Sequence, residues 1–487
     1  MGDKPIDTDK PDGTQAGSDP STQVTLEISA FRKVLKNRDF MALWIGQGVS
    51  SIGDWVIVGI LLDSLNRLDP HWGVFWMMTF RFLPAFLFGL LAGAVVDRLE
   101  RKTLMILCEL ARCALVVALA FANSLVLICG IVFGIECFSL LFGPAKDSCI
   151  PDLVKKDEVM TANSMMSTST YLTMALGTLI ATVILGLAAL IHRFPLVRYV
   201  VANEATFQHQ FAFIVDALTF LVSAMLLFTI AFPKRRTLTD QKFSARSIFG
   251  DLKEGLSFMR TDPLTRGILG IMIVGFIGGG SLYVLGAPFA QQVLHSTGAK
   301  FTLILSMLMI GVVVGAGLTP WLSKKLAMNK WFTRAVIGFG VTMLVFAFVD
   351  LYPLSLVIIF IGGCLLGYLL VSAYTLLHQN LSEDIRGRVF AAMQTIMRTC
   401  LLISMGIFAA LQALFFKWIP YTAAKPVNKV LNLGLFSKSF YPSMLALMIG
   451  GAVVVVGGCV FMPSIHRFFN EKEEGGGENA EAAGPAT

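Results

Sequence analysis

The 487-residue sequence contains few charged residues. Asp, Glu, Lys and Arg make up 15% of it, whereas hydrophobic residues make up 55%, and the mean hydropathy is +0.71. An ordinary soluble domain carries about 25% charged residues, so this composition excludes that class. Apolar runs of about the length of a membrane-spanning helix recur along the whole chain. The sequence therefore predicts a multi-pass membrane protein.

Motifs for metal, disulfide or nucleotide chemistry are also missing. The eight cysteines form no Cys-x-x-Cys pair and lie in or beside apolar runs, which argues against a disulfide framework and a zinc site. There is no Walker motif, and the glycine-rich patches have no strand–turn–helix context. We therefore expect no cofactor, no metal, no catalytic residue and no enzymatic activity. The net charge of +7 is explained by its distribution over loops and does not indicate a nucleic-acid partner.

The apolar runs predict an all-α fold of twelve transmembrane helices in two six-helix bundles. A long basic linker, 233–263, separates the sixth span from the seventh, and Ile248, Leu252, Leu256 and Met259 within it recur at the spacing of an amphipathic helix. The predicted domains are a disordered tail 1–30, a bundle 31–232, the linker, a second bundle 264–465, and a disordered tail 466–487. The predicted spans are 40–66, 73–97, 103–122, 124–149, 160–191, 211–232, 264–290, 299–323, 331–349, 354–381, 386–415 and 441–464.

The basic residues predict the orientation. With the N-terminus inside, 28 of the 39 Lys and Arg residues fall in cytoplasmic segments and 8 in external loops. Such a bias places both termini in the cytoplasm. Two external loops are long, 192–210 and 416–440, and each is either a short interfacial helix or lid, or a tolerated insertion.

A charged hairpin, Gly93–Lys102, joins the second and third spans. Its sequence, Gly-Ala-Val-Val-Asp-Arg-Leu-Glu-Arg-Lys, resembles the signature loop of the major facilitator superfamily, except that Glu100 stands where a glycine is usual. The alternative is an ordinary basic cytoplasmic loop. We expect Asp97 to latch the cytoplasmic side shut against the start of the eleventh span. The predicted gating residues are Gly93, Asp97, Arg98, Arg101, Lys102, Arg386 and Arg388.

Further stretches sharpen this resemblance over about residues 35–465. The opening (Leu35–Phe40, Leu43–Gln47 and Ser50–Asp54) resembles the bacterial branch that contains enterobactin exporters and macrolide-efflux proteins, as do Asp251–Gly255, Phe213–Ser223 and Ile385–Ala391. A competing resemblance lies in spans four and five. Phe142–Lys146, Ile150–Leu153, Ala162-Asn163 and Ala175–Thr178 look like bacterial lysophospholipid transporters, and Gly177-Thr178 replaces the Gly-Pro pair that is usual in antiporter-type exporters.

Charged residues inside the spans are the candidate site residues, because a charge buried in a membrane is costly. Asp54 is close in depth to Arg81, so the two are predicted to pair, either for proton coupling or for helix packing. Glu109 and Arg112 share a helix face, which favours a structural pair. Glu136 is expected to pair with Arg112 or to hold a proton. Asp216, near the outer end of span six, is predicted to be a gate or helix cap.

Arg398 is the charge deepest in the second half, and we expect it to receive an anionic group. The candidates are thus Asp54, Glu136 and Glu109 for proton coupling, with Arg81, Arg112 and Arg398 as charge partners.

The resemblance and these charges predict a secondary active transporter of the bacterial inner membrane that works by alternating access. We expect a monomer that exports a small amphipathic molecule (a drug, macrolide or siderophore-like compound) in exchange for protons, among membrane lipids. One alternative is lysophospholipid translocation, with Arg398 or Lys146 meeting the phosphate. Another is a membrane scaffold or sensor that transports nothing.

Overall fold

The computed structural model describes residues 31–69, 72–155, 158–231, 257, 261–296, 299–325, 328–418, 421–422, 425–426 and 441–482. The amphipathic helix expected in the linker and most of the 416–440 loop lie outside these residues. Almost everything described is helical. The described helices and strands are α2 (Arg38–Leu68), α3 (Gly73–Arg98), α4 (Arg101–Leu119), α5 (Leu125–Leu153), α6 (Val159–Ile191), α7 (Pro195–Val200), α8 (Glu204–Thr229), α10 (Pro263–Gly279), α11 (Ser281–Gln292), α12 (Ala299–Lys325), α13 (Met328–Phe348), α14 (Tyr352–Asn380), α15 (Glu383–Trp418), α16 (Pro442–Ala482) and the paired strands β1 (Tyr421–Thr422) and β2 (Lys425–Pro426).

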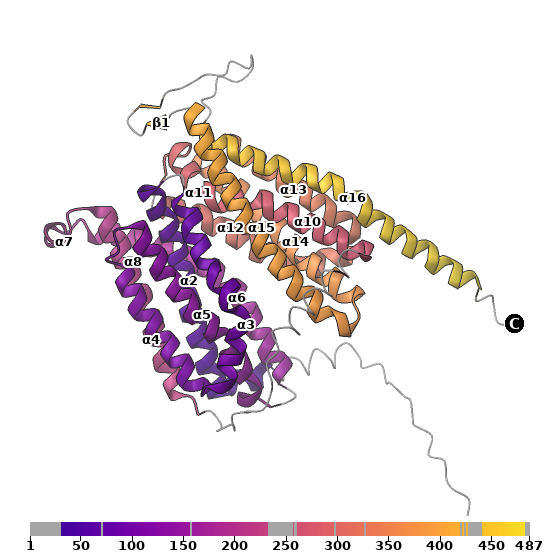
Figure 1. The fold of residues 1–487 in the computed structure, drawn as a ribbon, viewed down its shortest axis with the longest axis horizontal. Coiled ribbons are helices and arrows are strands. Elements are labelled where there is room, and N and C mark those ends of the chain that lie inside the picture. The colour runs from indigo at the N-terminus through magenta and orange to yellow at the C-terminus, as the bar shows by residue number, and fades with distance from the viewer. Residues whose placement is uncertain are drawn as a thin grey trace, which may run out of the picture.

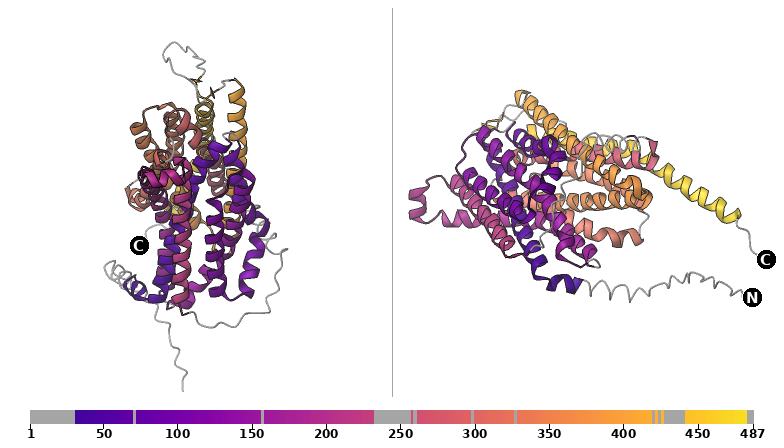
Figure 2. Two further views of the ribbon diagram at one scale, coloured as in Figure 1. Left: turned by 90° about the vertical axis from the view of Figure 1, so that its left-hand side faces the viewer. Right: turned by 60° about the horizontal axis from the view of Figure 1, so that its bottom comes forward.

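The helices form two bundles that lie side by side (Figures 1 and 2). In the first, α2 packs on α6 and α8, α4 on α5 and α8, and α3 on α5; in the second, α12 packs on α14, α13 on α14 and α16, and α10 on α16. Within the described residues, ten helices are long and apolar enough to cross a membrane. Helices α3 and α4 occupy the second and third predicted spans, but the apolar part of α3 is shorter and α4 carries four charged residues.

Three boundaries differ from the sequence prediction. Helix α8 begins at Glu204, because Asn203 caps it by accepting a hydrogen bond from the Thr206 amide; the predicted span began at 211. The seventh span is broken at Gly280 into α10 and α11, where three glycines follow one another. Helix α16 continues to Ala482, where the composition had predicted a disordered tail.

Part of the 192–210 loop forms the six-residue helix α7. It projects from the side of the first bundle, and Leu196, Tyr199 and Val200 on it are exposed, Tyr199 to 89%. His192 anchors the start of this segment through its ring Nε2, 2.8 Å from the Val201 carbonyl oxygen.

Glycines create a close backbone seam between α12 and α14. A Cβ atom built on Gly311 or Gly315 would meet backbone atoms of α14, and one built on Gly363 or Gly367 would meet backbone atoms of α12. Small residues let helix backbones approach in this way, and the resulting van der Waals packing holds membrane helices together. The seam explains why these two helices contact each other so extensively.

Replacing Gly315 with alanine is expected to destabilise the protein by about 1–3 kcal/mol, because the added methyl group would press on the Cys364 backbone. The matched control is Gly317→Ala on the same helix, where the methyl group meets open space and stability should hold or rise slightly. Thermal denaturation of the two purified variants in one detergent compares them. Equal melting temperatures would contradict the seam.

Two ends of the molecule can be defined from the chain. At the linker end α2 begins and α8 ends, and the Ala231 amide donates to Asp39 Oδ1 at 3.3 Å. At the far end the two bundles touch: Thr182 of α6 donates from Oγ1 to Thr302 Oγ1 of α12 at 3.0 Å, and Phe75 of α3 packs on Gly406 of α15. These two contacts between the bundles therefore gather at the far end.

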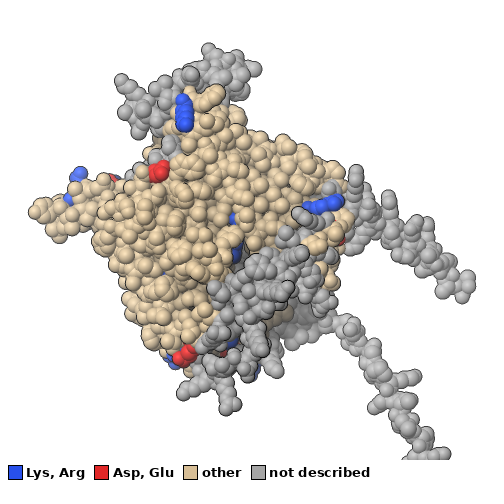
Figure 3. All heavy atoms as spheres, viewed as in Figure 1, with Lys and Arg blue, Asp and Glu red and all other residues tan. Residues whose placement is uncertain are grey.

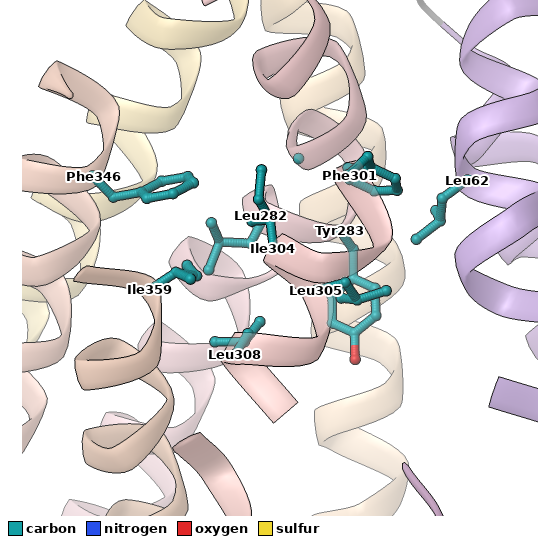
Figure 4. A pocket seen from close by; sticks show the side chains of 10 residues that line it. Leu62, Leu282, Tyr283, Phe301, Ile304, Leu305, Leu308, Phe346 and Ile359 are labelled. Carbon is teal, nitrogen blue, oxygen red and sulfur yellow. The ribbon is translucent and has the colours of Figure 1, made fainter. Parts of the chain in front are cut away.

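A small apolar cavity of about 40 Å³ adds to this far-end contact (Figure 4). Leu62 of the first bundle faces Leu282, Phe301 and Ile304 of the second across it. The Tyr283 ring lines the cavity, but its hydroxyl points away from Phe346 and out of the apolar space. The bundles thus meet through aliphatic and aromatic surfaces, with hydroxyl groups between α6 and α12.

Candidate functional site

The centre of the first bundle holds an ion pair sealed from water. Glu109 Oε1 and Arg112 Nη2, three residues apart on α4, lie 2.7 Å from each other, and the side chains are 0% and 3% exposed. Ser223 donates from Oγ to Glu109 Oε1 at 3.0 Å, and Ser50 donates to Oε2 at 3.4 Å. Two hydroxyl donors, from α2 and α8, and the Arg112 charge on α4 therefore hold the Glu109 carboxylate, which makes it a structural anchor among these three helices.

Two aromatic rings enclose the Arg112 guanidinium. Its central carbon lies 4.8 Å from the ring centre of Phe142 on α5 and 4.7 Å from that of Phe220 on α8. Such cation–π contacts contribute about 2 kcal/mol or more where water is excluded. They fix the plane of the guanidinium and leave one nitrogen, Nη1, directed toward α2.

Asp54 is the acid that connects this buried pair to solvent. Its Oδ2 lies 3.8 Å from Arg112 Nη1, and its side chain is 29% exposed although it lies in the middle of α2. A carboxylate at this distance is held by charge attraction without a tight hydrogen bond. Of the acids around Arg112, Asp54 is thus the one placed to exchange a proton with water.

A second ion pair lies on the neighbouring helices. Arg81 Nη2 of α3 is 3.2 Å from Glu136 Oε1 of α5, with side chains 24% and 22% exposed. The sequence prediction had paired Asp54 with Arg81, and had Glu136 either paired with Arg112 or holding a proton; in the structure Arg112 lies by Asp54 and Arg81 by Glu136. Arg81 still acts on Asp54 through its charge, so the four groups form one electrostatic network.

The second bundle contributes to the same space. Arg398 of α15 is exposed and is near enough to Glu136 for their charges to interact. Tyr283 of α11 is near enough to Arg81 to feel the charge of its guanidinium. Figure 3 shows basic side-chain atoms in a hollow between the two bundles. We call this space the recess and define it by Asp54, Arg81, Glu136, Tyr283 and Arg398. It lies on the linker side of the far-end contacts.

The surface of α15 beside Arg398 is amphipathic. One turn toward the linker end, Gln394 donates from Nε2 to the Tyr374 hydroxyl at 2.5 Å, and the Tyr374 and Phe390 ring centres are 5.7 Å apart. Phe390 also stacks with His378, whose ring centre is 6.4 Å away. A cation, an amide and an aromatic ring therefore follow one another along α15, and Tyr374 and His378 of α14 lie beside them.

Asp216 is not at a helix end, contrary to the sequence prediction. Because α8 starts at Glu204, the residue lies halfway along the helix, and it is only 1% exposed. It accepts a hydrogen bond from Thr219 Oγ1 at 3.2 Å and lies against Gly53 of α2. The early helix cap at Asn203 was the sequence signal that would have placed it correctly.

The hairpin contacts its own bundle where its side chains are described. Arg101 donates from Nη1 to the Ser148 carbonyl at 2.9 Å, and Lys102 donates from Nζ to the Ile230 carbonyl at 2.7 Å, so they tie α4 to the ends of α5 and α8. Glu100 accepts from Thr103 Oγ1 at 2.8 Å at the start of α4, where a negative charge contributes about 0.3–1 kcal/mol. This role accounts for glutamate in place of glycine. The side chains of Asp97, Arg98, Arg386 and Arg388 and the surroundings of Gly93 lie outside what the structure describes.

Two residues in the stretches that resemble lysophospholipid transporters, Lys146 and Gly177, have structural roles here. Lys146 is 15% exposed and its Nζ lies 2.6 Å from Asp147 Oδ1, so its charge is already compensated. Gly177 packs on α2, where a Cβ would meet the Ile52 carbonyl and the Trp55 side chain. Among the described residues, no group of three His, Cys, Asp or Glu side chains is arranged to hold a metal ion.

The fold and the recess define a polytopic helical membrane protein with a charged space between two bundles. The sequence model of the Major Facilitator Superfamily matches residues 43–401, and the chain belongs to this superfamily of membrane transporters.

Individual relatives agree with this assignment. YfiS of Bacillus subtilis (strain 168), an uncharacterized MFS-type transporter, is 26% identical over 385 residues, 74% of this chain and 83% of that protein. The proposed bacilysin exporter BacE of Bacillus amyloliquefaciens is 21% identical over 365 residues, 74% of this chain and 86% of that protein. Among solved structures, an inward-facing bacterial homologue of the human lysosomal transporter Spinster superposes with a TM-score of 0.66 at 14% identity, covering 89% of this chain and 98% of the other. An inward-facing bacterial homologue of ferroportin gives a TM-score of 0.60 at 14% identity, covering 86% and 98%.

Proposed function

We propose that the protein is a proton-coupled exporter of small amphipathic molecules that works by alternating access. The observation that carries this proposal is the recess, a mid-membrane space with a partly exposed acid, Asp54, held loosely by a buried cation. The amphipathic wall of α15 supports the substrate class, and the relationship to BacE supports the export direction. The chain would then belong with the bacterial branch that contains enterobactin exporters and macrolide-efflux proteins.

The distribution of basic residues supports placing the linker end and both termini in the cytoplasm of a bacterial inner membrane. The far-end contacts would then close the outer side, and the conformation would face inward. In this scheme residues 31–232 and 264–465 are the two bundles that rock about the recess, in a monomer.

Proton exchange would be centred on Asp54 and Arg112. When Asp54 is ionised, it is attracted to the Arg112 guanidinium and draws α2 toward α4. When Asp54 takes up a proton, this attraction is lost, while Glu109 keeps Arg112 neutralised. The buried pair is therefore unchanged in either state, and only the tie to α2 varies. Glu136, neutralised by Arg81 at a similar exposure, is the second candidate for the same exchange.

The direct test is flux in proteoliposomes that contain the full-length protein. Ethidium accumulation should be driven by an imposed pH gradient and should collapse when a protonophore is added. Flux that ignores the pH gradient would overturn the coupling, and no flux of any probe would favour the scaffold alternative. Because ethidium is cationic and aromatic, it suits a recess with exposed acids and aromatic rings.

Lysophospholipid translocation is the second candidate function. It is favoured by Arg398, an exposed guanidinium that faces the recess and has no ion-pair partner among the described residues. A phosphate is a good ligand for such a group, because guanidinium and phosphate form charge-assisted paired hydrogen bonds.

Arg398→Gln separates the two candidates. If the substrate is a lysophospholipid, the loss of a charge-assisted hydrogen bond, about 1.5–3 kcal/mol, should weaken apparent affinity for fluorescent lysophosphatidylcholine about tenfold or more. Ethidium flux through the same variant should persist. Equal effects on both probes would show that Arg398 does not bind a phosphate.

The hairpin Gly93–Lys102 remains the proposed gate. Arg101 and Lys102 brace its second half against α5 and α8. Such bracing would hold Asp97 at a fixed position from which it could meet Arg386 and Arg388 when the cytoplasmic side closes.

A further inference from the structure

Asp216 is an acid that the proposed mechanism does not use. Its side chain is buried in the middle of α8, and its Oδ1 accepts the Thr219 hydroxyl hydrogen bond. Its Oδ2 has no hydrogen-bond partner in the described part of the chain. Gly53 lies directly against it, next to Asp54 in the chain, so α2 has no side chain at the one position where the carboxyl group needs room.

The charges that face Asp216 do not compensate it. Helix α2 presents Asp54, and α4 presents Glu109, Arg112 and the Cys113 thiol. Helix α6, which also packs on α8, contains no charged residue. The guanidinium of Arg112 already lies against the carboxylates of Glu109 and Asp54. Three acids therefore surround one cation. Asp54 and Glu109 form ion pairs with it, whereas Asp216 forms no ion pair with any residue that the structure describes.

An isolated carboxylate cannot stay ionised in such a place without a large free-energy cost. A carboxylic acid avoids this charge cost: Oδ1 accepts the hydrogen bond from Thr219 in the space that Gly53 leaves open, and a proton on the unpartnered Oδ2 makes the group neutral.

We propose that Asp216 is a second, buried proton-binding site that holds a proton in this conformation and passes it to Asp54 through water that enters when α2 and α8 move apart. In this transfer the O–H bond at Asp216 breaks and an O–H bond forms at Asp54, so the total charge of the two acids is unchanged. The transfer step rests on the proposed proton coupling, whereas the bound proton does not.

Infrared spectroscopy of the purified full-length protein at neutral pH tests the bound proton. The carboxylic-acid C=O band of the wild-type protein should lose one component in Asp216→Asn, a neutral substitution of the same size. Wild-type protein labelled with ¹³C at the aspartate carboxyl should show a shifted band from the same group, which keeps the test available if the variant does not fold. Unchanged band intensity in Asp216→Asn, or no protonated aspartate in the labelled protein, would overturn the proposal.

Two glycine variants provide a matched control for the site itself. Gly53→Ala should shift the Asp216 band, because its methyl group would displace the carboxyl group. Gly48→Ala, on the same helix but facing open space, should leave the band unchanged. Equal spectra for both glycine variants would contradict the proposed geometry. A normal Asp216 band in a protein whose flux ignores the pH gradient would refute the coupling but leave the proton site standing.

Discussion

Arg112→Met is expected to lower the stability of the protein by about 3–5 kcal/mol. The change removes the cation from a pair whose side chains are 3% and 0% exposed and leaves the Glu109 carboxylate uncompensated among α2, α4 and α8. It also removes both cation–π contacts, with Phe142 and Phe220. A fluorescence-based thermal denaturation assay in detergent measures the loss.

The matched control is Arg81→Met in the partly exposed pair. Because Arg81 and Glu136 are 24% and 22% exposed, water can solvate the remaining acid, and the loss should be about 1 kcal/mol or less. Adding Glu109→Gln to Arg112→Met should recover part of the lost stability, since the double variant no longer buries an unpaired charge. Equal destabilisation by the two arginine variants would contradict the assignment of Arg112 as the buried anchor.

Asp54→Asn is expected to abolish transport driven by a pH gradient while leaving the protein folded. The amide has the shape of the protonated acid and cannot release a proton, so α2 would lose the varying tie to Arg112. Stability should change little, because Asp54 is partly exposed and Glu109 still neutralises Arg112. Ethidium flux in proteoliposomes, with and without the gradient, measures the effect.

Two further variants are the controls for this experiment. Glu136→Gln should reduce gradient-driven flux less than Asp54→Asn if Asp54 is the principal exchange site. Glu109→Gln should instead lower stability, because it breaks the buried pair with Arg112 and weakens the contact with Ser223. Full gradient-driven flux in Asp54→Asn would exclude Asp54 as the coupling residue.

The sequence predicted the class of fold because membrane insertion requires long apolar runs, and these can be read directly. It also singled out the charged residues that the structure brings together in two ion-paired groups, since any charge in a span is conspicuous. It could not predict which acid meets which base. Depth in the membrane follows from counting residues, but helix rotation does not, and rotation directs Arg112 toward Asp54 and Arg81 toward Glu136.

The position of Asp216 in its helix could not be predicted correctly from hydropathy. A hydropathy run marks where a helix is apolar, whereas α8 begins with a mostly polar stretch, Glu204 to Gln210, that the run leaves out. Counting from the apolar start therefore placed Asp216 near an end. The hydroxyl contacts between Thr182 and Thr302 were missed for a related reason, because threonine and serine are common in spans and most of them bond to their own helix.

The far-end contact between the bundles has an electrical consequence. The groups described there, the Thr182 and Thr302 hydroxyls, the Phe75 ring on Gly406 and the aliphatic cavity around Leu62, carry no net charge. Moving one elementary charge across the membrane changes its energy by about 2.3 kcal/mol per 100 mV, whereas moving a neutral group changes it by nothing. Separating this seal should therefore be insensitive to the membrane potential. Any voltage dependence of transport would then arise from protons moving to and from the acids of the first bundle and from the charge of the substrate itself.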